Sequence, residues 1–334
     1  MEKGEACATN YAENAAEKPL AVIDKCLLQG TCELPARQSD ECLAVLQTKA
    51  DLVVPPILIE ETIVSFLEAE TDARPVYQRM LGIIQKLRSC WMEEPLELIF
   101  RELILQEDIW LDLHVNSEMG QMLFDTVANP GSLSPEGNAW LAARREEKQQ
   151  RLEARLENQT LRKNTYGMNA LHFPSLAAFM KRGIKQLCVE VSSSSELKMR
   201  RLNRYLGRNL KKRHPDHATS IEKAFSGATF DSLDKTRFSR NYLLAEILYD
   251  LGTISSYTNQ LGDVANVLPR NRGRQINDED DQQYVAAALA CHRLLTCDAG
   301  MHRVAALFSE RGIWTGKSVH IPRQEIHRLD DFLQ

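Results

Sequence analysis

Two short apolar runs near the N-terminus alternate with segments of helical spacing. Leu20–Asp24 (LAVID) and Leu52–Pro55 (LVVP) have the length and the apolar character of buried strands. An amphipathic stretch of about residues 39–49 lies between them, and a helix that opens with Pro56 follows the second run. The order strand, helix, strand, helix predicts a parallel sheet with helices packed on its faces.

The same alternation returns at the end of the chain. Residues 281–291 favour a helix, Arg293–Thr296 (RLLT) favours a strand, and Lys317–Ile321 (KSVHI) favours a further short strand. Two halves of one α/β domain are therefore expected to flank the middle of the chain.

The long middle segment is predicted to be mostly helical. Residues 95–113 place apolar positions at helical spacing, and residues 140–163 have charges on most faces of a long helix. An insertion of this length exceeds any loop, so we expect a helical subdomain with its own core. The predicted organisation is a tail over 1–18, a first part of the α/β domain over 19–72, the insertion over 73–274 and a second part over 275–334.

The composition is that of an ordinary globular chain. The 334 residues include 41 Lys and Arg against 46 Asp and Glu, and 43% are hydrophobic, which argues against long disorder or a fibrous repeat. The formal net charge of −5 shows no overall bias toward nucleic acid. No run approaches the roughly 20 apolar residues that cross a bilayer, so no membrane partner is expected.

Eight cysteines are spread over the chain without a repeated short spacing. Since the N-terminus shows no apolar signal segment, we expect reduced thiols and a cytoplasmic location. No CxxC pair or Cys/His cluster has the spacing of zinc ligands, so the sequence predicts no zinc site.

Carboxylates follow the predicted strands. Asp24 closes the first strand, Glu60 and Glu61 lie just past the second, and Asp298 follows the third. Because the carboxyl ends of neighbouring parallel strands share one edge, where ligands bind, these acids are expected to converge. Asp281 is expected at the start of the helix that precedes the third strand. The chain would run along this helix and return along the strand, so Asp281 and Asp298 would end near each other.

A cluster of like charges needs a counter-charge. Hard oxygen ligands favour Mg²⁺ or Mn²⁺ over zinc. A cation held in this way can bind a phosphodiester oxygen, lower the pKa of a bound water and stabilise the departing oxygen. The sequence therefore leads to the hypothesis of metal-dependent phosphodiester hydrolysis.

Four segments resemble the successive motifs of a known family. They are LAVIDKCLLQG, LVVPPILIEETI, DDQQYVAAALACHRLLTCDAGM and KSVHIPRQEIHRLDDFL. In order and spacing they resemble the motifs of PIN-domain nucleases, which implies a compact α/β/α fold with a parallel sheet and an acidic metal pocket. The resemblance covers only the two ends of the chain, and most small members of the family have a short helical segment in place of the long middle.

The resemblance implies functions for five residues. Asp24, Glu61, Asp281 and Asp298 match the acids of the metal pocket, and Thr296 matches the hydroxyl residue of the Thr-x-Asp motif, which helps to position the pocket or the substrate. The register is ambiguous by one position at Glu60/Glu61 and at Asp280/Asp281, because adjacent acids point to different faces of a helix. The alignment of the motifs favours Glu61 and Asp281.

Single residues also have plainer interpretations. Asp24 alone is as often a turn cap as a ligand, and the acidic run of residues 278–281 suits a helix start. Cys297 is expected to be an inert buried thiol, because strand alternation turns it away from its neighbours.

A second group of candidate residues is basic. The segment 198–213 (KMRRLNRYLGRNLKKR) contains Lys198, Arg200, Arg201, Arg204, Arg208, Lys211, Lys212 and Arg213. Contacts from Lys and Arg to phosphate supply most of the sequence-independent affinity for nucleic acid. Beside an acidic pocket, this run predicts substrate binding, and the alternative is a solvated helix face or a subunit contact.

Together these features predict a metal-dependent nuclease. RNA is the favoured substrate because the resembled family acts mostly on RNA, and single-stranded DNA is the open alternative. The second hypothesis is a non-catalytic PIN-like module whose insertion binds a protein partner or nucleic acid, and the third is a phosphatase for small phosphate esters. Homodimerisation and a role in defence against mobile elements or in RNA processing stay open.

Overall fold

The structure is a computed structural model that describes nine stretches of the chain. They are residues 18–87, 91–107, 117–129, 133–146, 207–227, 238–239, 242, 272–310 and 314–333. The predicted tail, apart from residue 18, and the segment 147–206 lie outside the described residues.

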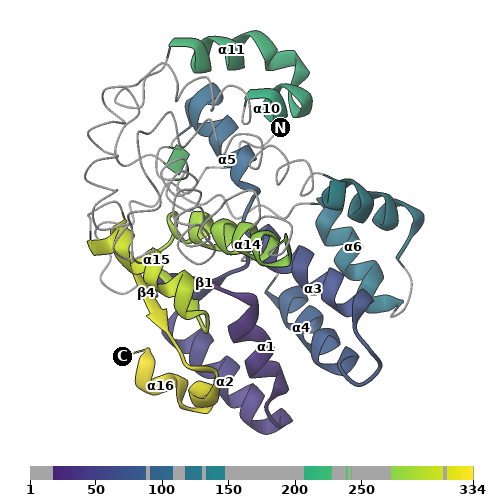
Figure 1. Cartoon of the computed structure of the whole chain (residues 1–334), viewed down its shortest axis with the longest axis vertical. Coiled ribbons are helices and arrows are strands. Elements are labelled where there is room, and N and C mark those ends of the chain that lie inside the picture. The colour runs from purple at the N-terminus through teal and green to yellow at the C-terminus, as the bar shows by residue number, and fades with distance from the viewer. Residues whose placement is uncertain are drawn as a thin grey trace, which may run out of the picture.

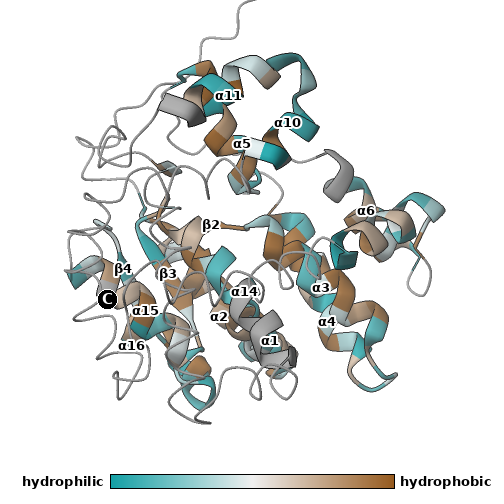
Figure 2. Ribbon diagram, turned by 45° about the horizontal axis from the view of Figure 1, so that its top comes forward, coloured by the Kyte–Doolittle hydropathy of each residue, from teal (hydrophilic) through white to brown (hydrophobic). Residues whose placement is uncertain are grey.

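A parallel sheet joins the two ends of the chain (Figures 1 and 2). Its strands are β1 (Leu20–Ile23), β2 (Asp51–Val53), β3 (Arg293–Thr296) and β4 (Lys317–His320), and their order is β2-β1-β3-β4. Val22 of β1 is level with Val53 of β2 on one side and with Leu294 of β3 on the other. The prediction of an α/β fold with a parallel sheet is confirmed.

The two central strands, β1 and β3, are buried on both faces. Ala21, Val22 and Ile23 are fully inaccessible to solvent, and so are Leu294 and Leu295. Helix α14 packs against both strands, and α15 packs against β3 and β4. Strands that are covered on both faces have continuous apolar runs instead of an alternating pattern, which is why LAVI and RLLT could be recognised in the sequence.

Two helices connect β1 to β2, although the sequence predicted one. The amphipathic stretch at 39–49 belongs to α2 (Ala36–Lys49), and α1 (Lys25–Glu33) precedes it. Helix α1 was missed because it is short and begins directly at the strand end. The Asp24 side chain starts it as the N-cap, by accepting a hydrogen bond from the backbone N–H of Leu27 at 2.7 Å.

The packed core continues past the predicted boundary at residue 72. Helix α3 (Pro56–Glu68) follows β2, and α4 (Arg74–Lys86) packs against both α1 and α3. Trp91 then forms a parallel bridge to Val54, just beyond β2. Elements from both sides of residue 72 therefore share one core, and the division into a domain and an insertion stays a prediction.

The described part of the middle segment is helical. Its further elements are α5 (Pro95–Phe100), the π-helix η2 (Arg101–Leu105), α6 (Ser117–Ala128), a helix over 135–146, α10 (Arg208–Arg213), the 3-10 helix η5 (Pro215–His217) and α11 (Ala218–Gly227). The helix predicted over 95–113 becomes a π-helix at Arg101 and ends before Gln106, whose φ of 56° is left-handed.

The C-terminal part supplies the rest of the sheet and its cover. Around β3 and β4 lie α14 (Arg272–Ala288), α15 (Ala299–Glu310), the 3-10 helix η8 (Arg323–Arg328) and α16 (Leu329–Phe332). The helix predicted to begin at Asp281 begins at Arg272, so Asp281 lies inside α14. The acidic run of residues 278–281 is therefore part of a longer helix and does not mark its start.

Within the described residues, no helix is both long and apolar enough to span a bilayer. The cysteines of those ranges, Cys26, Cys32, Cys42, Cys291 and Cys297, are all free thiols.

Gly316, just before β4, is a position where the fold requires the absence of a side chain. A Cβ there would lie 2.5 Å from the carbonyl oxygen of His292 and 2.4 Å from Cε2 of Trp314. Because a shift of the backbone costs free energy, we predict that Gly316→Ala lowers the free energy of unfolding by about 1–3 kcal/mol. Denaturant unfolding followed by circular dichroism measures this change.

Gly82 of α4 provides the matched control, because nothing lies within 4 Å of a Cβ at that position. Gly82→Ala should raise the free energy of unfolding by roughly 0.5–1 kcal/mol, as expected for glycine in a helix interior. Equal effects of the two substitutions would contradict the described packing at Gly316.

Candidate functional site

The carboxyl ends of β1 and β3 meet at Asp24 and Thr296. The backbone N–H of Asp24 donates to the carbonyl oxygen of Leu295 at 3.1 Å, which extends the pairing of the two strands by one residue. At that point the Thr296 hydroxyl donates a hydrogen bond to Oδ2 of Asp24. Asp24 and Thr296 are both buried, with 1% and 0% of their surfaces exposed, so the contact lies inside the protein.

Burial changes the ionisation of Asp24. Desolvation raises the pKa of its carboxyl group from 3.8 to about 7, although the hydrogen bonds from Thr296 and from the Leu27 backbone N–H act to lower it. The negative charges of Asp298 and Glu61 raise this pKa further. The charges of Asp298 and Glu61 therefore both reach the buried carboxyl group of Asp24.

Thr296 also connects Asp24 to Asp298. The Thr296 hydroxyl oxygen accepts a hydrogen bond from the backbone N–H of Asp298 at 2.8 Å while its proton is donated to Asp24. Oδ1 of Asp298 accepts from the backbone N–H of Met301 at 2.7 Å and so caps α15. Within the described residues, Oδ2 of Asp298 accepts no hydrogen bond, and the residue is partly exposed. Asp298 can therefore present one oxygen to a ligand.

Glu61 reaches the site from α3. Its Oε2 accepts a hydrogen bond from the Tyr284 hydroxyl at 2.7 Å, and its Oε1 lies 3.8 Å from Nζ of Lys25. The Lys25 and Glu61 side chains are 23% and 18% exposed. Both carboxylate oxygens of Glu61 thus have a partner in the protein itself.

Tyr284 of α14 is a site residue that the sequence analysis missed. It is buried, and burial raises the pKa of its hydroxyl well above 10, an effect to which the charge of Glu61 adds. It lies in the run DQQYVAAAL, to which no chemical role was assigned. Its spacing in the sequence was the available signal. Tyr284 follows Asp280 by four residues and Asp281 by three, and residues three or four apart lie on the same face of a helix.

Asp281 also lies within electrostatic reach of the site. Desolvation raises the pKa of the Cys26 thiol, in the first turn of α1, to about 11, and the charges of Asp24, Asp298 and Asp281 contribute. Asp280 is buried, and its charge acts on Tyr284. The contacts favour Glu61 over Glu60 as the acid that faces Asp24, while both Asp280 and Asp281 act on site residues.

Cys297 is not suited to act as a nucleophile. Its side chain is half-buried between Thr296 and Asp298, and burial, aided by the charge of Asp24, raises the pKa of its thiol to about 12. The thiol therefore stays protonated at neutral pH, and a protonated thiol is a poor nucleophile.

The donor chemistry of the site fits a hard divalent cation. Asp24, Glu61, Asp281 and Asp298 offer only carboxylate oxygens, and a positive charge would relieve the repulsion that Asp298 and Glu61 exert on Asp24. Within the described residues, however, no three Asp, Glu, His or Cys side chains are close enough to share one ion. Glu61 is held by Tyr284 and Lys25, so binding of a cation would require this side chain to move.

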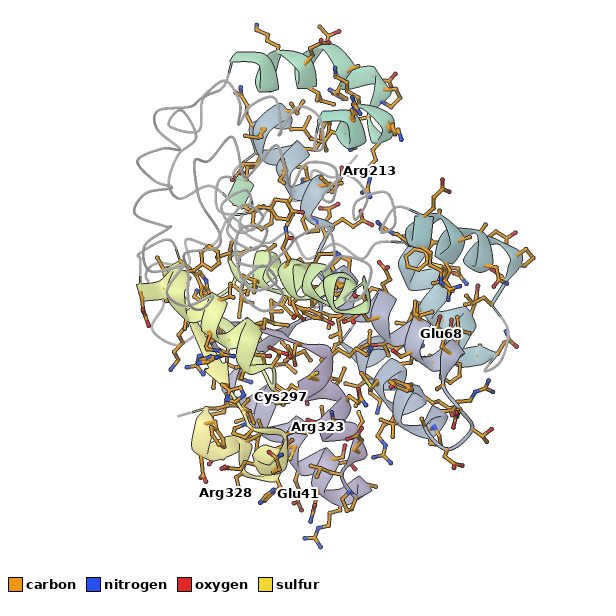
Figure 3. The ribbon with its side chains drawn as sticks, viewed as in Figure 1. Glu41, Glu68, Arg213, Cys297, Arg323 and Arg328 are labelled. Carbon is orange, nitrogen blue, oxygen red and sulfur yellow. The ribbon has the colours of Figure 1, made fainter. Side chains whose placement is uncertain are left out.

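The described part of the basic segment lies apart from the acids. Figure 3 shows Arg213, the last residue of α10, well away from Cys297, which directly precedes Asp298. Lys198, Arg200, Arg201 and Arg204 lie outside the described residues.

Ion pairs account for two of the basic residues that are described. Arg213 and Arg144 both pair with the buried Glu94, and Nζ of Lys211 lies 3.2 Å from Glu222. Arg208 and Lys212 are exposed. Their contact with nucleic acid stays a prediction, and Arg213 has a structural role in tying α10 to α5.

Comparison with known proteins adds no relative to this picture: no family model, no curated protein and no solved structure matches the chain.

The raised pKa of Asp24 predicts a pH-dependent stability. Between about pH 4 and pH 7 the unfolded chain ionises Asp24 while the folded protein keeps it protonated, so the stability linked to this proton is lost as the pH rises. In chelator, Asp24→Asn should therefore gain on the wild type by roughly 1 kcal/mol per pH unit across that interval, and no further above it. Denaturant unfolding at several pH values measures the difference.

Asp40→Asn, at an exposed position of α2, is the control for the removal of a carboxylate. A stability difference between wild type and Asp24→Asn that stays constant with pH would show that Asp24 is ionised in the folded protein like any surface acid.

Proposed function

We propose that the chain is a PIN-like α/β/α metal-dependent nuclease whose active site is the edge formed by Asp24, Thr296 and Asp298. The observation that carries the proposal is the buried carboxylate of Asp24, which Thr296 connects to Asp298 and which the charge of Glu61 also reaches. Burial of a carboxylate close to other acids is unfavourable for the fold alone. Such an arrangement is typical of a functional site.

Each acid has a distinct part in the proposed reaction. Asp24 and Asp298 would hold Mg²⁺ or Mn²⁺ together with Glu61 and Asp281, and the bound ion would supply a water of lowered pKa and a positive charge at the cleaved phosphodiester. Thr296 orients Asp24 through its hydroxyl proton and fixes the backbone of Asp298. No side-chain nucleophile is needed, which agrees with the protonated thiol of Cys297.

Lys25 and Tyr284 hold Glu61 when the acids have no cation between them. The Lys25 ammonium group supplies a positive charge beside Glu61, and the Tyr284 hydroxyl fixes the other oxygen. A divalent ion carries more charge than one ammonium group at this edge, so we infer that it would displace Lys25 from Glu61.

RNA is the proposed substrate, on the strength of the four motif segments that resemble the PIN-domain family. Arg208 and Lys212 of α10 are exposed, so both are available to contact a phosphate of the substrate.

The proposed location is cytoplasmic, with which the free thiols of the described cysteines are consistent.

A non-catalytic nucleic-acid or protein-binding module is the second candidate. It is favoured by one observation: in the described residues no three potential ligands already share a metal position. The two candidates differ in whether the acids are needed for cleavage.

The nuclease proposal predicts cleavage that depends on metal and on both central acids. Purified protein with Mn²⁺ should cleave labelled single-stranded RNA, and chelator should abolish the activity. Asp24→Asn and Asp298→Asn should each lower the rate by at least 100-fold, because each removes an oxygen ligand and a negative charge. Gel analysis of the products from RNA and from single-stranded DNA gives the substrate preference.

Asp40→Asn serves again as the control, since this exposed residue of α2 is not one of the acids of the site. Cleavage that survives both active-site substitutions would exclude this site. Binding without cleavage under every metal condition would favour the non-catalytic module.

Thr296 gives a separate prediction, because its hydroxyl acts only through Asp24 and Asp298. Thr296→Val keeps the shape but loses both hydrogen bonds, so Mn²⁺ affinity and cleavage should fall by about 10- to 100-fold, as for other residues that orient metal ligands. Thr296→Ser retains the hydroxyl and should restore most of both. Calorimetric Mn²⁺ titration checks this; equal affinities of the Val and Ser variants would refute it.

A further inference from the structure

Arg323 is a cation at the same sheet edge as the acids. Strand β4 ends at His320 beside Thr296 of β3, and η8 begins three residues later at Arg323. In Figure 3, Arg323 and Cys297 lie near one another beside α1. Arg323 therefore follows the end of β4 in the way that Asp298 follows the end of β3.

Electrostatic effects place Arg323 near two thiols that lie next to the acids in the sequence. Its positive charge acts on the thiols of both Cys26 and Cys297. Cys26 is two residues after Asp24, and Cys297 directly precedes Asp298. The guanidinium group thus lies close to Cys26, which is near Asp24 in the sequence, and to Cys297, which is next to Asp298.

The structure holds Arg323 in place from two sides. Nη2 donates to both carboxylate oxygens of Glu33 at 2.6 Å. Gly30 of α1 allows η8 to approach, because a Cβ there would lie 3.5 Å from Cγ of Arg323 and 2.3 Å from Cδ1 of Ile326. Arg323 is thus fixed on the surface of α1 by its partner and by the packing beneath it.

The Arg323 guanidinium group still has capacity to bind a ligand. The side chain is 46% exposed, and within the described residues its Nη1 donates to no protein acceptor. A planar guanidinium group that keeps free N–H donors matches the oxygen geometry of a phosphate. Lys25, a second cation near the acids, is paired with Glu61. The described part of the basic segment lies away from the acids.

We propose that Arg323 forms a phosphate-binding subsite for a single-stranded nucleic acid, one that holds a backbone phosphate next to the acidic edge. This inference rests on the proposed nuclease function and names the residue that positions the strand for it. Glu33 holds the guanidinium group on the surface of α1 through its ion pair and does not itself contact the strand.

Binding of short fluorescein-labelled oligouridine and oligothymidine, followed by anisotropy in chelator, tests the subsite without cleavage. Arg323→Ala should weaken binding by about 5- to 20-fold and lower the slope of log Kd against log salt by about 1, as expected for the loss of one phosphate contact. Arg323→Lys should keep the salt slope, since it retains the charge.

Arg328→Ala is the matched control, because Arg328 is an exposed arginine of the same 3-10 helix that pairs with Glu325 and Asp331. Its affinity should stay within about twofold of the wild type. Equal affinities and equal salt slopes of the Arg323→Ala and Arg328→Ala variants would overturn the subsite. Metal-dependent cleavage would then still support the nuclease.

Glu33→Gln separates phosphate binding from a structural role. This variant keeps Arg323 but weakens its ion pair, so a phosphate subsite predicts binding equal to or tighter than that of the wild type. If Arg323 acts only by packing η8 on α1, Glu33→Gln should lose affinity as Arg323→Ala does, which would overturn the proposal. A wild-type protein that binds neither oligonucleotide and cleaves none would overturn the subsite and the nuclease together.

Discussion

The contact between Thr296 and Asp24 is the interaction on which the rest of the structure around the site depends. It forms where β1 and β3 end side by side, and one oxygen of Asp24 accepts from Thr296 while the other caps α1. Because the same hydroxyl oxygen accepts from the backbone of Asp298, the start of α15 is fixed as well. The register of two central strands and the first turns of two helices are thereby coupled to one buried carboxylate.

This arrangement is unfavourable for the stability of the fold. Burial raises the pKa of Asp24 to about 7, and Asp298 and Glu61 increase the unfavourable charge. An ionised carboxylate in such surroundings costs several kcal/mol unless a positive charge compensates it. Lys25 supplies one positive charge beside Glu61, and a divalent cation would supply more. The same repulsion that weakens the fold would then favour binding of the metal.

The sequence predicted the features that depend on short stretches of chain. LAVI and RLLT are continuous apolar runs because their strands are buried on both faces, and the acids at their ends follow from parallel pairing. Helix α1 was missed because its N-cap, Asp24, directly follows a strand and was interpreted as the end of that strand. Asp281 was placed at a helix start because no local sequence signal shows that α14 begins at Arg272. The contacts of Tyr284 and Arg323 join residues more than 200 positions apart. No local pattern specifies such pairs, since they depend on how the helices pack on the completed sheet.

The most direct test of the account is a calorimetric titration of the wild-type protein and of Asp24→Asn with Mn²⁺ at neutral pH. The account predicts saturable binding of Mn²⁺ to the wild type and a loss of at least tenfold in affinity in the variant, because Asp24 is the centre of the acidic edge. Absence of binding to the wild type, or equal affinity in the two proteins, would contradict it.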